Sequence, residues 1–63
     1  MNNEEKIKSM AEMMLTMIML DKKKATNHIL EMISLYHGKS GFTLEMLIDA
    51  AKMAIKMGED HEN

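Results

Sequence analysis

Apolar residues recur every three or four positions in the first third of the chain, which is the spacing of one face of a helix. At 100° per residue, four of them project within about 60° of one another. These are Ile7, Ala11, Met14 and Ile18. Asn2 or Asn3 is suited to cap the N-terminus of a helix. The two glutamates that follow are favourably placed in its first turn, where the helix dipole is positive. The pattern predicts a helix over about residues 4–20.

A run of one aspartate and three lysines, residues 21–24, interrupts this pattern. Asp21 is suited to cap a new helix, and the lysines suit the negative end of the preceding one. The apolar stripe then resumes in phase at Ala25, so one long helix over 4–37 is the alternative. We expect the break, with a second helix over about 22–37, because three helices of similar length pack more completely than one long and one short.

Two glycines mark a firmer boundary. Gly38 suits the left-handed position after a helix, and Gly41 follows three residues later. Thr43 is a candidate cap, and Phe42 and Leu47 stand at the positions of a hydrophobic staple. We therefore expect a third helix over 44–57 that stops at Gly58. The prediction is a single helical domain over residues 1–58 and a polar, frayed tail over 59–63.

Composition supports an all-α fold. The 63 residues include ten Met, six Ile, six Leu and five Ala, but no Val, Trp or Pro. These are helix formers, and the β-branched and aromatic residues that strands favour are scarce. A chain below about 70 residues rarely gains more than about 3–5 kcal/mol from one core. Because there are no cysteines, and three scattered histidines make no zinc set, association with another chain is the expected additional source of stability.

More of the helical surface is apolar than one small bundle can cover. Seven of the eight residues in 13–20 are apolar. The helix over 44–57 has two apolar faces beside one polar line. One face consists of Leu44, Leu47, Ile48, Ala51, Ala54 and Ile55, and the other consists of Met46, Ala50, Met53 and Met57. A helix that is apolar nearly all round must be buried nearly all round. We therefore expect a homodimeric helical bundle. Its expected dimer or partner interface consists of Met13, Met17, Met19, Leu20, Met46, Met53 and Met57.

The methionines allow two interpretations that do not exclude each other. Flexible, polarizable Met side chains suit a deformable surface that binds a host protein. They are also ordinary core filler in a proteome whose codons favour Met. The abundance of Met, Ile, Lys and Asn without Arg or Pro is typical of AT-rich phage, plasmid or low-GC bacterial genes.

Charge argues against base-specific nucleic-acid recognition. The net charge is −2 and every basic residue is Lys, whereas Arg makes most bidentate contacts with guanine. A local basic patch remains, made up of Lys22, Lys23 and Lys24, and of Lys39 if the two loops are neighbours. Such a patch suits phosphate or an acidic protein, and its ordinary interpretation is a solvated linker.

No catalytic or cofactor-binding pattern emerges. Gly38-Lys39-Ser40 matches the end of a phosphate-binding loop, but Ile33 stands where that motif needs Gly and a helix precedes it instead of a strand. His28 fits a solvated helix face and His37 fits a helix C-terminus, while His61 lies in the acidic tail. We expect a protein that is not an enzyme and holds no cofactor or metal.

The apolar run over residues 13–20 is far shorter than the roughly 20 residues that cross a membrane. We expect a cytoplasmic protein. The favoured hypothesis is a small regulator or inhibitor that binds a larger host protein. The alternative is a dimeric nucleic-acid-binding regulator that contacts phosphates through Lys22–Lys24.

Overall fold

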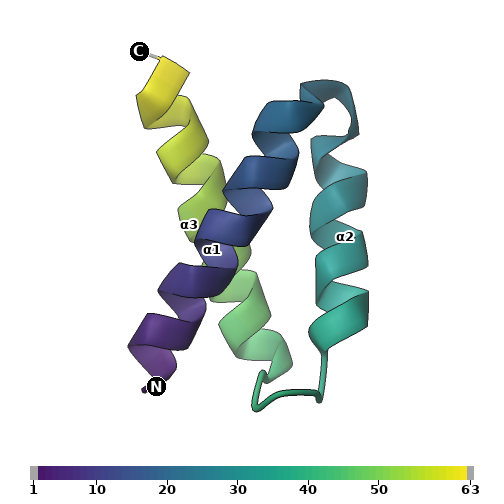
Figure 1. Ribbon diagram of the computed structural model, residues 1–63, viewed down its shortest axis with the longest axis vertical. Coiled ribbons are helices and arrows are strands. Elements are labelled where there is room, and N and C mark those ends of the chain that lie inside the picture. The colour runs from purple at the N-terminus through teal and green to yellow at the C-terminus, as the bar shows by residue number, and fades with distance from the viewer. Residues whose placement is uncertain (1, 63) are drawn as a thin grey trace.

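The computed structural model describes the backbone of residues 2–62 and the side chains of residues 2–60. This part of the chain forms three α-helices and one 3₁₀ turn, and it contains no strand (Figure 1). The elements are α1 (Asn3–Leu20), η1 (Lys22–Lys24), α2 (Ala25–Tyr36) and α3 (Leu44–Glu62). The predicted all-α, three-helix architecture is confirmed, and the alternative of one continuous helix over 4–37 is wrong.

Helix α1 begins where its cap was predicted. The side-chain Oδ1 of Asn2 accepts a hydrogen bond of 2.8 Å from the backbone N–H of Glu5. This bond satisfies one of the amide groups that a helix leaves without an internal partner in its first turn.

Asp21 ends α1 through its backbone. Its φ of −153° and ψ of 90° are those of extended chain, and its side chain makes no capping hydrogen bond. The Lys24 amide donates to the Asp21 carbonyl at 3.1 Å, which closes a 3₁₀ turn. Helix α2 therefore starts at Ala25 and not at the predicted residue 22, because this tighter turn takes up the three lysines.

Residues 37–43 reverse the chain between α2 and α3. Gly38 and Gly41 adopt φ values of +75° and +79°, a region that side chains disfavour. The Lys6 side chain of α1 ends close to Gly41, where it lies near the turn. The loop therefore depends on both glycines for its path.

The predicted cap of α3 is also present. The Met46 amide donates to Thr43 Oγ1 at 3.2 Å. The Phe42 ring meets the Tyr36 ring edge-on at 5.9 Å between centroids, and Phe42 also packs against the core cluster to which Leu47 belongs. These contacts fix the end of α2 and the start of α3 relative to each other.

Helix α3 does not stop at Gly58 as predicted. It continues to Glu62, so residues 59–62 of the predicted tail belong to the helix, whereas Asn63 lies outside the described residues. A Cβ atom at Gly58 would lie 3.5 Å from Leu15 Cδ1. Gly58 thus lies inside the helix, on the side that faces α1, and does not act as a left-handed helix stop.

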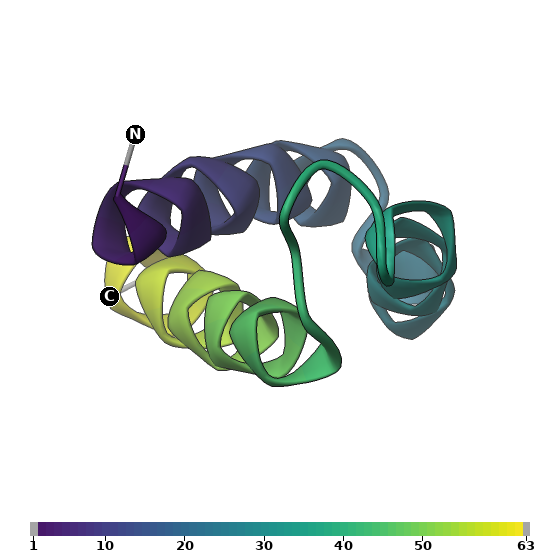
Figure 2. The same ribbon diagram turned by 90° about the horizontal axis from the view of Figure 1, so that it is seen from below.

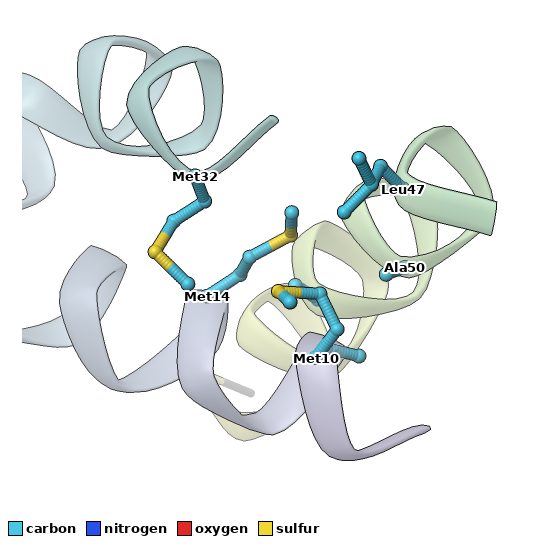
Figure 3. Packing of buried hydrophobic residues seen from close by; sticks show 7 residues of the cluster. Met10, Met14, Met32, Leu47 and Ala50 are labelled. Atoms are coloured by element: carbon cyan, nitrogen blue, oxygen red, sulfur yellow. The ribbon is translucent and has the colours of Figure 1, made fainter. Parts of the chain in front are cut away.

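Helix α1 is the centre of the fold. It crosses α3 in an X, and α2 lies along its other side (Figures 1 and 2). Most contacts between helices join α1 to α3, and α2 makes the fewest with α3. The core is rich in sulfur because Met10 and Met14 of α1 and Met32 of α2 all belong to it (Figure 3). Its buried members are Met10, Ala11, Met14, Met32, Leu47, Ala50 and Ala54.

Candidate partner-binding surface

Polar side chains are largely at the surface in the described residues. Among them there is no group of three His, Cys, Asp or Glu side chains that could hold a metal ion, and no polar or charged residue is buried. His28 differs from the prediction of a solvated residue, because it is half-buried and its Nδ1 atom is enclosed without a hydrogen-bond partner. No helix in the described part of the chain has the length and apolar character needed to cross a membrane.

The outer side of α1 over its C-terminal half is almost entirely apolar. Leu20 is 78% exposed and Met13 is 43% exposed. The one hydroxyl in residues 13–20 belongs to Thr16, and it donates a 3.0 Å hydrogen bond to the Glu12 carbonyl of its own helix. Thr16 therefore needs no polar partner. We call this surface the α1 outer face, and it consists of Met13, Leu15, Thr16, Met17, Met19 and Leu20.

Two hollows on the α1 outer face share Thr16. One, of about 270 Å³, is lined by Met13, Thr16, Met17 and Met32. The other, of about 370 Å³, is lined by Leu15, Thr16, Met19 and Leu20. Because both hollows border Thr16, they adjoin each other and form one uneven apolar surface along the helix.

A third hollow connects this surface with α3. It has a volume of about 210 Å³ and lies where the C-terminal ends of α1 and α3 approach η1. Its lining includes Met19 from the α1 outer face and Ile55 from α3. Only Lys22 and Glu59 bring charged groups to its border. This hollow thus brings the exposed apolar residues of α1 and α3 together, with two charged residues at its border.

On α3 this surface continues as a line of aliphatic side chains. Leu44, Ile48 and Ile55 are 44%, 41% and 47% exposed, and Ala51 lies half-buried between them. At 100° per residue all four project within about 60° of one another. We call this line the α3 stripe. Together, the α1 outer face and the α3 stripe form the candidate partner-binding surface.

The sequence did not indicate which side of α3 would be buried. Leu44, Ile48 and Ile55 were grouped there with Leu47 on one apolar face, and the methionines were placed on a second face. In the structure α1 packs between these two groups, onto Leu47, Ala50 and Ala54. Ala50, Ala54 and Gly58 recur every four residues, a spacing of small residues that signals a close helix contact and that could have identified this side.

The structure therefore places the residues of the predicted interface on different surfaces. Its four α1 members lie together on the α1 outer face, although Met17 is half-buried. Its α3 members do not join them. Met46 is only 7% exposed, which contradicts its prediction as an interface residue, and Met57 is half-buried. Met53 is exposed, but it lines a separate hollow whose other lining residues include Glu4, Lys8 and Asp49.

The basic residues are divided as well. Lys22, Lys23 and Lys24 are exposed on η1, and Lys39 is exposed in the loop at the other end of α2 (Figure 1). The 12 residues of α2 keep these two ends about 18 Å apart at 1.5 Å per residue. The two loops are not neighbours, so the condition under which Lys39 would join the other lysines is not met.

The amount of exposed surface agrees with an unfilled binding site. The accessible surface of the protein is 4534 Å². A compact monomer of the same 7.2 kDa mass is expected to expose about 4,100 Å².

No protein-family model matches this chain, and no curated protein and no solved structure is significantly similar to it.

Proposed function

We propose that this protein is a non-catalytic regulator or inhibitor that acts by binding a larger protein, as the products of small phage and plasmid genes often do. The α3 stripe is the proposed site. The observation that carries the proposal is the row of three half-exposed aliphatic side chains, Leu44, Ile48 and Ile55, with no hydrogen-bonding group among them. The partner is a protein segment that offers a matching apolar surface.

An amphipathic helix of the partner suits this site best. The stripe extends over the 12 residues from Leu44 to Ile55, or about 16 Å, which is three turns of helix. Ala51 in its middle leaves room for a side chain of the partner between Ile48 and Ile55. Burial of the exposed part of each aliphatic residue would contribute about 1 kcal/mol.

Charged residues alongside the stripe provide a basis for specificity. Glu45, Asp49, Lys52 and Lys56 are all exposed on the adjacent side of α3. They carry both signs, so a partner helix needs complementary charges in one register to dock. Interface charges of this kind select the partner and its orientation more than they add affinity.

Protein binding is favoured over the nucleic-acid alternative by the position of the lysines. A protein that follows a phosphate backbone needs cations spread along the contact. Here the exposed lysines of η1 are clustered at one end of α2, and Lys39 lies at the other.

A photocrosslinking experiment tests the proposal. A photoreactive phenylalanine analogue replaces Ile48 in one variant and Lys56, on the polar side of α3, in the other. Each variant is irradiated in a nuclease-treated lysate of the host cell. We expect one dominant protein adduct from position 48 and a tenfold weaker adduct from position 56.

Competition with unlabelled protein provides the matched control. Glu31→Lys, which changes an exposed residue of α2 outside the stripe and its charged border, competes for the crosslink as wild type does, whereas Ile48→Glu does not compete. Equal crosslinking from both positions would contradict the proposal. So would recovery of nucleic acid alone from a lysate that has not been nuclease-treated, with retention that falls steeply as salt is raised.

A further inference from the structure

The α1 outer face carries both a protruding side chain and a hollow. Leu20 is the most exposed of the large hydrophobic side chains in the described residues. One turn toward the N-terminus lies the hollow of about 270 Å³ lined by Met13, Thr16, Met17 and Met32. A cavity of about 150 Å³ already holds a benzene ring, so this hollow has room for a leucine side chain.

We infer that the occupant of this face is a second copy of the same chain, bound antiparallel across a twofold axis beside Thr16 and Met17. In such a dimer each copy inserts Leu20 into the hollow of the other. A twofold interface requires this kind of self-complementarity, because the same residues serve both partners. A protrusion and a hollow on one face of one helix meet that requirement.

Helix geometry places the two features at matching distances from the axis. With the axis between residues 16 and 17, antiparallel pairing sets Met13 of one copy level with the partner's Leu20. Side chains on a helix lean toward its N-terminus, so Leu20 reaches back toward the middle of the hollow. The fit follows from the spacing of residues on α1 alone.

Charge decides between antiparallel and parallel pairing. The N-terminal half of α1 carries exposed Glu5 and Glu12 on the same side as Thr16, and exposed Lys23 follows its C-terminal end. Antiparallel pairing brings Lys23 within about one helical turn, or about 5 Å along the axis, of the partner's Glu12. Parallel pairing would place Lys23 beside the partner's Lys23 and each glutamate beside the same glutamate of the partner, so that like charges would repel.

The α1 outer face leaves three large apolar side chains open to a partner. Met13 is 43% exposed, Met19 is 41% exposed and Leu20 is 78% exposed. The inference goes beyond the proposed function, because it uses α1 where the host-protein site uses α3. Each can therefore fail without the other.

Sedimentation equilibrium from micromolar to millimolar concentration tests the inference. We expect wild type to approach twice its 7.2 kDa mass. Leu20→Glu should weaken association about 100-fold, because the substitution is present in both copies and so affects the twofold interface twice. Leu30→Glu is the matched control, an exposed leucine of α2 that lies outside this face, and it should leave the dissociation constant within threefold of wild type. Circular dichroism verifies that both variants remain helical.

The orientation has its own test. Glu12→Lys and Lys23→Glu should each weaken association about fivefold at low salt, and the double exchange should restore it. A Met13→Cys chain should form disulfides with a Leu20→Cys chain faster than either forms with itself, and the chain has no other cysteine.

Three results would overturn the inference. The first is a monomer at millimolar concentration, and the second is equal weakening by Leu20→Glu and Leu30→Glu. The third is a Met13→Cys chain that crosslinks faster with itself than with Leu20→Cys. If Leu20→Glu loses the dimer while the host-protein crosslink from position 48 persists, the two sites are separate.

Discussion

Helices α1 and α3 pack tightly at their crossing, whereas α2 is held much more loosely. The crossing is lined by buried Ala11, Ala50 and Ala54, and Gly58 approaches Leu15 closely. Small residues let two helix backbones come near each other, and this maximises dispersion contacts. Helix α2 contributes only one buried residue, Met32.

The contrast explains why so much apolar surface is exposed. Helix α2 covers one side of α1 and touches α3 little, so much of the α3 stripe and of the α1 outer face stays exposed. Stability and the proposed binding thus depend on different parts of the same helices. The crossing sides of α1 and α3 hold the fold together, and their outer sides are available to partners.

The largest effect should come from a cavity at the crossing. Leu47→Ala removes a fully buried side chain and should lower the free energy of unfolding by about 3 kcal/mol. Since a domain of this size has about 3–5 kcal/mol in total, much of the variant should be unfolded at 25 °C. Urea denaturation followed by circular dichroism measures the loss. Leu44→Ala, a half-exposed leucine of the same helix, should cost about 1 kcal/mol or less.

A cavity under α2 should cost less than one at the crossing. Met32→Ala is expected to lower the free energy of unfolding by about 2 kcal/mol, at the low end for a buried methionine, because Met32 retains 8% exposure and borders an open hollow. Hydrogen exchange should quicken in α2 before it does in α1 or α3. A loss as large as that of Leu47→Ala, with uniform exchange, would show that α2 is as firmly held as the other helices.

Local signals in the sequence predicted the elements well. The Asn2 and Thr43 caps, the break at Asp21 and the turn at Gly38 each depend on a few neighbouring residues, and all were found as predicted. The end of α3 was not predicted correctly, because a glycine after an apolar stretch can have either of two roles. It can end the helix in the left-handed conformation, or it can let a neighbouring helix pack closely. The local sequence around Gly58 is the same in both cases.

The smallest effect distinguishes these two uses. Gly58→Ala should raise the free energy of unfolding by about 0.5 kcal/mol, because Ala is the better helix former and its Cβ would meet Leu15 Cδ1 at an ordinary 3.5 Å. Thermal unfolding followed by circular dichroism measures the change. A loss of about 1 kcal/mol would instead indicate a left-handed helix stop and would contradict the continuation of α3 to Glu62.

The binding surface was predicted only in part, for a physical reason. The sequence located the α1 outer face, because residues 13–20 are apolar on every side and some must stay outside. On α3 it predicted the interface at Met46, Met53 and Met57, whereas the exposed residues of the α3 stripe are Leu44, Ile48 and Ile55. Which flank is left uncovered depends on how α1 and α2 dock on α3, and periodicity within one helix does not contain that information.

The ten methionines provide the most direct test of the central claim that the outer sides of the crossing helices bind a partner and their inner sides do not. With ¹³C-labelled methyl groups, NMR spectra are recorded over a dilution series of the wild-type chain. We expect the Met13 and Met17 methyl signals to shift with concentration, while those of buried Met10 and Met14 stay fixed. Signals from Met13 and Met17 that do not move up to millimolar concentration, or shifts of equal size at Met10 and Met14, would contradict the account.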